Sequence, residues 1–267
     1  MKKKILVAAH MGCFGGNIPG NTIASAELAL RSGADIIELD VTMSRDGQLF
    51  VFHPKLEKRF LNMDIDIQAM EAKDVEQLHF VNQQGVETSH TVCHLEDMLV
   101  FLRDRCIVNI DKFGDHPAEI AKVVRDLHMQ DQVIVKSPGK QNHFDMIAEV
   151  AYDLPYIPVL FDTDVVSDYL NSCKSIRFEG VEAVWGQDDA QVAQDDYIEK
   201  IHHMGKYIWV NPILFNDKRQ LVGGHSDDVS LLDDPDKGWG WLARKQFDII
   251  QTDWPLQLST YLRMLGY

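Results

Sequence analysis

Eight short apolar runs rich in β-branched residues recur along this chain, and segments with helical spacing separate most of them. The runs cover residues 5–9, 36–40, 106–111, 132–136, 156–161, 181–185, 207–210 and 248–252. Segments 22–30, 118–127, 144–152 and 197–204 repeat apolar residues at i, i+3 and i+4. Strands joined by helical crossovers pair in parallel and are buried on both faces. Eight such runs in 267 residues predict an α/β fold, the TIM (β/α)8 barrel, which takes about 250 residues. An open doubly wound sheet is the alternative.

One stretch interrupts the alternation after the second run. An Asp46-Gly47 turn is followed by an extended run over Leu49–His53. Residues 54–94 then show no sustained period before helical spacing resumes. We interpret 54–94 as an insertion between the second strand and its helix, and its place after the carboxyl end of a strand predicts that it covers the active-site face. Because no linker divides the chain, residues 1–267 are expected to form a single barrel domain.

The charge of the chain argues against two classes of partner. It has 26 Lys and Arg against 41 Asp and Glu, a net charge of −15, whereas nucleic acids and anionic membranes attract basic surfaces. We therefore expect neither a nucleic-acid nor a membrane partner. The N-terminal apolar stretch is too short for a signal peptide. The cysteines lack the spacing of a disulfide framework, and they are Cys13, Cys93, Cys106 and Cys173. These features favour a cytoplasmic protein with reduced thiols, and they leave the oligomeric state open.

Glu38 and Asp40 form the strongest candidate site. They lie two residues apart in a predicted strand, so both side chains point to one face, about 6.5 Å apart, while Ile37 and Leu39 face the helices. Two carboxylates directed into a barrel interior repel each other unless a positive charge lies between them. A divalent cation supplies that charge, and Mg²⁺ or Ca²⁺ prefers oxygen ligands.

The ends of the next two strands add further candidates. Asp111 ends the third run, where its carboxylate would complete an oxygen ligand set. Lys112 follows directly and is interpreted as a cation that faces a phosphate. Lys136 closes the fourth run and would add a second cation.

Two of the eleven histidines lie where acid–base chemistry would need them. His10 ends the first run, and His53 ends the extended run after the acidic strand. An imidazole can donate or accept a proton near neutral pH, because its pKa is close to 6.5. Two histidines that converge on a carboxylate pair therefore indicate a catalytic site.

Three other features allow simpler interpretations. The glycine-rich loop 12–21 either cradles an anion with its backbone N–H groups or is a flexible turn. The acidic stretch 223–236 lacks the EF-hand pattern and is expected to be a solvated loop. Asp253 is expected to be the N-cap of the last helix.

These residues resemble the signature of the glycerophosphodiester phosphodiesterases. That family shows His-Arg-Gly, Pro-Glu-Asn-Thr, Gly-Ala-Asp-x-Ile-Glu-x-Asp-Val, Asp-Gly and Val-x-His-Asp in this order. The segments here that match are His10–Gly12, Pro19–Thr22, Gly33–Val41, Asp46–Gly47 and Val51–Pro54. Later segments resemble the family's third acidic strand, its Trp-Thr-Val-Asn and its closing Thr-Asp-x-Pro, and they are Asn109–Lys112, Ile208–Asn211 and Ile249–Pro255. The resemblance covers the whole chain and is most specific over residues 33–53.

The resemblance implies a TIM barrel with an insertion after the second strand and a metal-dependent reaction on a small phosphodiester. Water or the glycerol 2-hydroxyl would attack phosphorus, and the products of hydrolysis are an alcohol and glycerol 3-phosphate. The implied site consists of Glu38, Asp40 and Asp111 as ligands of Mg²⁺ or Ca²⁺, His10 and His53 as the acid–base pair, and Lys112, Lys136 and Trp209 as substrate-binding residues.

Four departures from the family pattern leave two alternatives open. Met11 replaces Arg, Gly20 replaces Glu, Pro54 replaces Asp, and Lys112 follows Asp111 without the usual intervening residue. Loss of a guanidinium that binds phosphate would weaken transition-state stabilisation by a few kcal/mol. The alternatives are a degenerate member that binds a phosphorylated ligand without turnover, and a lyase that forms a cyclic phosphate.

Overall fold

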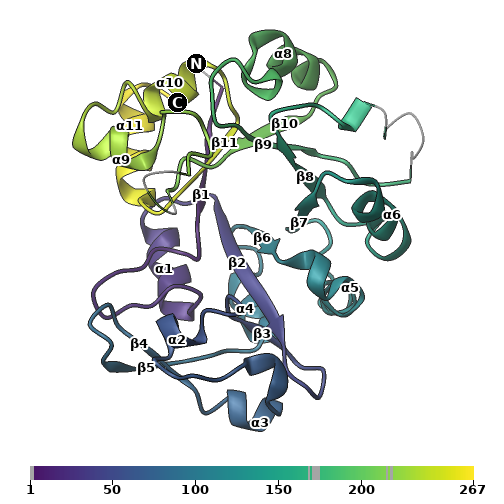
Figure 1. The fold of residues 1–267 in the computed structure, drawn as a ribbon, viewed down its shortest axis with the longest axis vertical. Coiled ribbons are helices and arrows are strands. Elements are labelled where there is room, and N and C mark those ends of the chain that lie inside the picture. Colours follow the sequence, from purple (N-terminus) through teal and green to yellow (C-terminus); the bar gives the residue numbers. More distant parts are fainter. Residues whose placement is uncertain (1–2, 168, 170–174, 215, 217–218) are drawn as a thin grey trace.

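The computed structural model describes residues 3–167, 169, 175–214, 216 and 219–267. Eight parallel strands in this part of the chain close into a barrel, because the first strand pairs with both the second and the last. The strands, in barrel order, are β1 (Leu6–Ala9), β2 (Ile36–Met43), β6 (Ile107–Asp111), β7 (Val133–Pro138), β8 (Tyr156–Phe161), β9 (Gly180–Val184), β10 (Tyr207–Val210) and β11 (Ile249–Thr252). Each corresponds to one predicted run, so the TIM barrel is confirmed and the open sheet is excluded (Figure 1). Cys173 lies outside the described residues.

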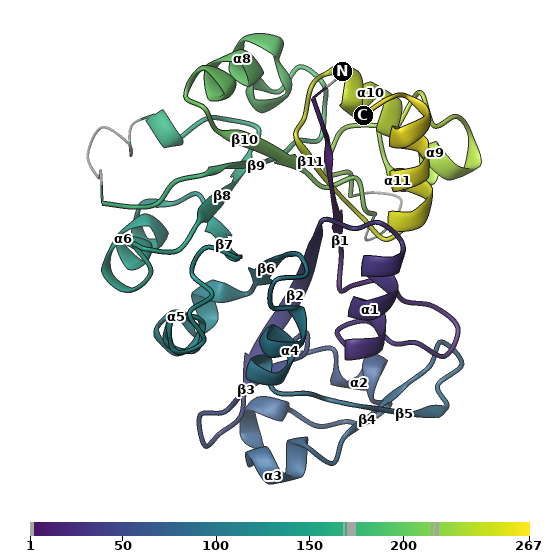
Figure 2. The same ribbon diagram turned by 180° about the vertical axis from the view of Figure 1, so that it is seen from behind.

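Helices surround the strands, as the view from behind also shows (Figure 2). They are α1 (Ile23–Arg31), α4 (Leu95–Leu102), α5 (Pro117–Asp126), α6 (Gln141–Val150), α8 (Asp195–His203), α9 (Asp227–Leu232), α10 (Trp239–Arg244) and α11 (Pro255–Met264), with 3-10 turns at Phe113–Asp115 and Gln191–Ala193. The first helix begins where the sequence predicts, since the Thr22 side chain accepts a hydrogen bond from the Ser25 N–H. Among the described helices, none combines the length and apolarity required to cross a bilayer.

The side-chain alternation along β2 separates the core from the site. Ile37 and Leu39 pack outward in one apolar cluster with Ala26 of α1 and Leu99 of α4. Ile36 points inward, and the residues that fill the barrel floor with it are Ala8, Ile134, Ile157, Trp209 and Ile249. Glu38 and Asp40 follow Ile36 on the inward face, closer to the carboxyl end of the strand. The period of two therefore places apolar atoms below the carboxylates and leaves the mouth of the barrel polar.

An additional layer follows β2, between that strand and α4. β3 (Leu49–Val51) pairs antiparallel with the end of β2, and β4 (His79–Val81) pairs with β5 (Glu87–Thr91). Short helices α2 (Glu57–Phe60) and α3 (Ala72–Val75) and a 3-10 turn at Ile67–Ala69 lie between them. This layer, here called the insertion, has an apolar cluster of its own that includes Phe52, Val75 and Phe80. It extends from the barrel beyond the carboxyl end of β2 (Figure 1).

Candidate active site

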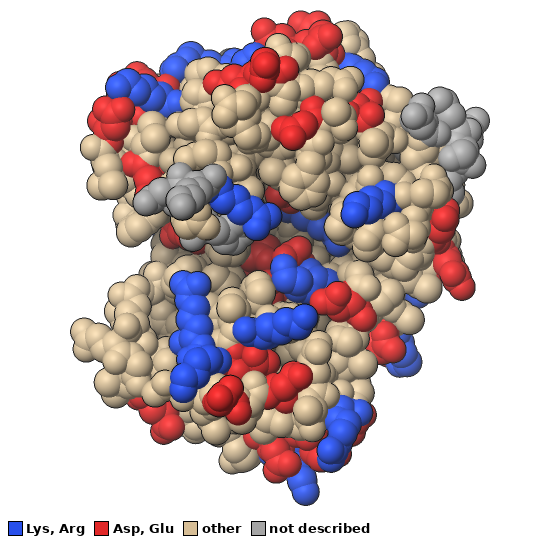
Figure 3. Space-filling model, in the orientation of Figure 1, with Lys and Arg blue, Asp and Glu red and all other residues tan. Residues whose placement is uncertain are grey.

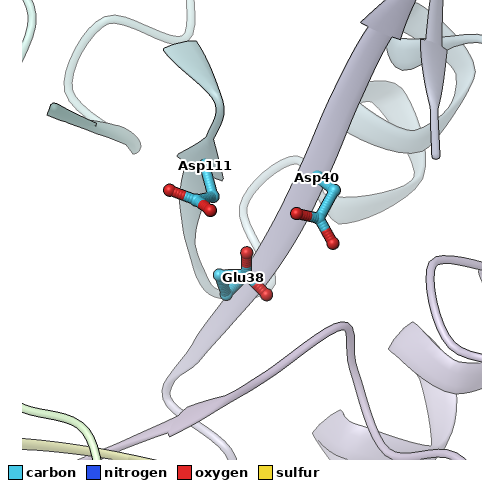
Figure 4. A group of neighbouring side chains, drawn as sticks. All are labelled: Glu38, Asp40 and Asp111. Carbon is cyan, nitrogen blue, oxygen red and sulfur yellow. The ribbon is translucent and has the colours of Figure 1, made fainter. Parts of the chain in front are cut away.

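Three carboxylates meet at the carboxyl ends of β2 and β6. The register of this strand pair sets Asp40 beside Asp111 and Glu38 beside Asn109. One carboxylate oxygen from each of Glu38, Asp40 and Asp111 lies within 4.8 Å of the others, and Figure 4 shows the two acids of β2 opposite the acid of β6. The structure thus brings together the three acids that the sequence singled out.

The glycine-rich loop after β1 holds two of these acids in place. The backbone N–H of Met11 donates to Glu38 Oε2 at 2.8 Å. The Asn21 side chain donates to Asp40 Oδ2 at 2.9 Å, and its own oxygen accepts from the Asp40 N–H at 3.2 Å. The polar groups at the two ends of the loop therefore fix the orientation of the carboxylates, and an anion cradle formed by its backbone N–H groups stays a prediction.

Burial makes this cluster electrostatically unfavourable without a cation. Glu38 and Asp40 are 3% and 1% exposed. Burial, together with the charge of Asp40, raises the pKa of Glu38 to about 8, against the lowering effect of His10. Three hard oxygen donors that repel one another in a buried position fit Mg²⁺ or Ca²⁺, which would offset the repulsion.

Lys112 supplies a positive charge next to the acids. The chain turns at Lys112 with a positive φ of 60°, and the ammonium lies 2.5 Å from Asp111 Oδ2 and 3.8 Å from Asp40 Oδ1. The negative charges of Asp111 and Asp40 raise the pKa of Lys112 although burial lowers it. In this structure Lys112 thus pairs with the acids, and its contact with a phosphate stays a prediction.

Both predicted histidines reach the same cavity, and each ring is held through Nδ1. His10 Nδ1 lies 2.8 Å from Asp253 Oδ1, and His53 Nδ1 lies 2.9 Å from the carbonyl oxygen of Pro54. His53 Nε2 is 3.9 Å from Asp40 Oδ1. Burial lowers the pKa of His10, but the hydrogen bond with Asp253 and the charge of Glu38 outweigh burial and raise it to about 9.

Asp253 and Asp227 support the candidate site from behind His10, and the sequence interpretation assigned both of them other roles. Trp254, not Asp253, is the N-cap of α11, and this leaves the Asp253 carboxylate to contact His10. Asp227, in a stretch expected to be a solvated loop, is 2% exposed in α9. It accepts hydrogen bonds from Trp239 Nε1 at 2.7 Å, Thr252 Oγ1 at 2.8 Å and the Asp253 N–H at 3.1 Å.

Lys136 and Trp209 contact each other in the barrel interior. The Lys136 ammonium is 2.8 Å from Glu182 Oε2 and 3.1 Å from the centroid of the Trp209 ring. Burial lowers the pKa of Lys136, and the charge of Glu182 opposes this. Trp209 is fully buried and donates from Nε1 to Gln251 Oε1 at 3.0 Å. The structure therefore places the ring beneath Lys136, in the barrel interior rather than on the cavity wall.

A cavity of about 250 Å³ opens above these groups. His10, His53 and Lys112 line it on the acidic side, and Phe161, Leu221 and Arg219 line it on the opposite side. Figure 3 shows this face hollowed across its middle, with acidic side chains inside the hollow and basic ones along its rim. Arg219 had no motif around it, so no sequence signal pointed to it.

The two largest departures from the family pattern are neighbours in space. A Cβ at Gly20 would lie 3.1 Å from Met11 Cβ and 3.3 Å from the Phe14 ring. Met11 is buried and adopts a positive φ of 51°. The replacements of Arg and Glu by Met11 and Gly20 therefore change one contact surface rather than two separate ones.

Comparisons with known proteins agree with this picture. A family profile described as a domain of unknown function, DUF4996, matches residues 156–262. A glycerophosphodiester phosphodiesterase of Bacillus altitudinis is 30% identical over 144 residues, which cover 49% of this chain and 57% of that relative. The chain thus spans less than two thirds of the length of this relative.

Solved structures agree over nearly the whole chain. A glycerophosphoryl diester phosphodiesterase of Parabacteroides distasonis has 17% identity and a TM-score of 0.80, covering 98% of this chain and 87% of its own. An Oleispira antarctica phosphodiesterase in complex with the product sn-glycerol-3-phosphate has 17% identity and a TM-score of 0.69, covering 97% and 96%. At these identities the structural likeness establishes the fold. Together the curated relative and the structural neighbours confirm that this chain resembles the glycerophosphodiester phosphodiesterases.

Proposed function

We propose that this protein is a metal-dependent phosphodiesterase that hydrolyses glycerophosphodiesters to an alcohol and glycerol 3-phosphate. The observation that carries the proposal is the convergence of three carboxylates beside two histidines that are both held through Nδ1. The name of the Bacillus altitudinis relative and the product bound by the Oleispira antarctica phosphodiesterase support the same reaction. Because glycerophosphodiesters are deacylated phospholipids, the activity would belong to lipid metabolism.

Glu38, Asp40 and Asp111 would hold the divalent metal, Mg²⁺ or Ca²⁺. When bound, it would neutralise charge on the non-bridging phosphate oxygens. Lys112 competes for two of the same carboxylates, so we expect its ammonium to turn toward the cavity when a metal binds. There it would pair with the phosphate, which is the role that the sequence predicted.

The two imidazoles would move the protons. With Nδ1 occupied by Asp253 or by the Pro54 carbonyl, each ring has its Nε2 available to a reacting oxygen. One histidine would take a proton from the attacking oxygen, and the other would give a proton to the departing alcohol oxygen. Asp253 would stabilise the imidazolium form of His10 in either role.

The direct test is release of sn-glycerol 3-phosphate from glycerophosphocholine or glycerophosphoethanolamine, with and without a chelator. We expect turnover that the chelator abolishes and that added Mg²⁺ or Ca²⁺ restores. Turnover that persists in the chelator would contradict the metal role. Phosphorus NMR of the product distinguishes hydrolysis from the lyase reaction, which would leave a cyclic phosphate.

The contact between Met11 and Gly20 favours one second candidate, a protein that binds a phosphorylated ligand without turnover. The double variant Met11→Arg/Gly20→Glu tests whether the missing groups limit the rate of a hydrolase. A hydrolase limited by the missing groups should gain about tenfold in kcat/KM, since a guanidinium adds charge-assisted hydrogen bonds to phosphate. Gly20→Glu alone should destabilise the fold by about 1–3 kcal/mol, because its side chain meets Met11 and Phe14. An unchanged or lower rate in the double variant would mean that the site is built for another reaction. Ligand binding without any turnover in the wild type would favour the binding protein.

A further inference from the structure

A second cavity, of about 360 Å³, lies between the glycine-rich loop and the insertion. The loop contributes Phe14 and Gly20, and the insertion contributes Lys58, Arg59 and Phe60. Asn82, next to β4, donates a hydrogen bond to Asn17 of the loop at 3.2 Å and connects the two walls. None of these side chains has a role in the chemistry proposed above.

One wall of this cavity is linked to the acidic cluster through Met11. Gly20, on its wall, is in contact distance of Met11, and the Met11 N–H donates to Glu38. On the other wall, Lys58 and Arg59 belong to α2, which starts four residues after His53. The cavity is thus flanked by residues that follow each of the two candidate catalytic histidines along the chain.

The charges around the cavity are unbalanced. Within the described residues, neither Lys58 nor Arg59 has a carboxylate at ion-pair distance, although the chain carries an excess of 15 acidic groups. The Arg59 guanidinium instead lies 5.2 Å from the centroid of the Phe60 ring. Gly20 adds no carboxylate at the position where the family motif has Glu. Two cations without a carboxylate partner, on a cavity that Phe14 and Phe60 also line, favour a ligand group with negative charge.

We infer that this cavity receives the alcohol portion of the substrate and that this portion carries its own anionic group, a carboxylate or a second phosphate. The inference rests on the proposed function, since it assigns the part of the diester that leaves phosphorus. Lys58 and Arg59 bind the anionic group, and Phe14 and Phe60 contact the carbon atoms beside it.

Matched substrates test this directly. Glycerophosphoserine differs from glycerophosphoethanolamine by one carboxylate, and glycerophosphoinositol 4-phosphate differs from glycerophosphoinositol by one phosphate. We expect kcat/KM to favour the anionic member of each pair by about fivefold or more at low ionic strength. The double variant Lys58→Gln/Arg59→Gln should bring both ratios close to one. Lys73→Gln, on α3 and away from the cavity lining, should leave them unchanged.

The possible failures are distinguishable. Equal rates within each pair would overturn the inference and leave the proposed function intact. A preference that survives in Lys58→Gln/Arg59→Gln would overturn the assignment to this cavity. If no diester is hydrolysed, the proposed function fails, and calorimetric affinities of the same four compounds still decide whether the cavity selects an anionic group.

Discussion

Asp253 Oδ1 lies 2.8 Å from His10 Nδ1, although 243 residues separate the two along the chain. The parallel pairing of β1 with β11 brings them together, since Ala9 is opposite Thr252 in that register. The contact fixes which imidazole nitrogen faces the cavity and favours the imidazolium form.

Asp253→Asn should lower kcat about 100-fold or more, because the amide cannot stabilise the imidazolium. Without the Asp253 charge the pKa of His10 falls from about 9, so the pH limb that His10 sets should move to lower pH. The measurement is kcat/KM as a function of pH. Asp188→Asn is the matched control, because Asp188 pairs with His225 outside the catalytic cavity. If Asp253→Asn kept the wild-type dependence of kcat/KM on pH, Asp253 would have no role in catalysis.

Asp227 should influence both stability and its pH dependence. Asp227→Ala leaves the three donors from Trp239, Thr252 and Asp253 without their acceptor, and it should cost about 2–4 kcal/mol in the free energy of unfolding. Burial raises the pKa of Asp227 to about 7, although the bonds from Trp239 and Thr252 lower it.

The sign of the pH effect follows from proton binding. Between the usual carboxyl pKa of about 4 and about 7, the folded protein binds a proton at Asp227 that the unfolded chain has lost. The Asp227 contribution to stability therefore declines as pH rises through this window. Urea unfolding of wild type and Asp227→Asn at about pH 5 and about pH 8 gives the free energy of unfolding of each protein. The value for the wild type minus the value for the variant should be smaller at the higher pH. A difference that grows with pH would contradict this assignment.

Glu38→Gln should abolish metal binding and increase the stability of the metal-free protein. The substitution removes one of three mutually repelling carboxylates. Because the pKa of Glu38 is about 8, the midpoint of thermal unfolding without metal should rise by a few degrees above that pH. Added Mg²⁺ or Ca²⁺ should raise the midpoint of the wild type and not that of the variant. Glu149→Gln, on the exposed surface of α6, provides the control. An equal response of both proteins to metal would place the ion elsewhere.

Lys112→Met should change metal binding and catalysis in opposite directions. Loss of the ammonium frees oxygens of Asp111 and Asp40, and the affinity for Mg²⁺ or Ca²⁺ should increase about tenfold. The same loss removes a phosphate partner, so kcat/KM should decrease about tenfold or more. Calorimetry and steady-state kinetics measure the two effects. Weaker metal binding in this variant would mean that Lys112 supports the site rather than competing for it.

Much of the fold and part of the site follow from local sequence. Alternation of apolar runs with helical spacing indicated all eight barrel strands, because each run has to be buried on both faces. The spacing of Glu38 and Asp40 indicated that they share a face, because side chains in a strand alternate with a period of two. His10, His53 and Asp111 were found because each ends an extended run, and in a parallel barrel the strand ends meet at one mouth.

Other residues depended on contacts that no local pattern specifies. Asp253 resembled a helix cap, and closure of the barrel brought it to His10. Asp227 resembled a solvated acid, and packing of the same part of the chain buried it. Lys112 lies against the acids at a turn where its backbone adopts a positive φ. Trp209 lies beneath Lys136 because β10 directs the Trp209 side chain into the barrel. The sequence by itself determined which side chains each strand directs toward the axis. The tertiary structure decided which of them touch, since strand pairing sets distances between residues far apart in the chain.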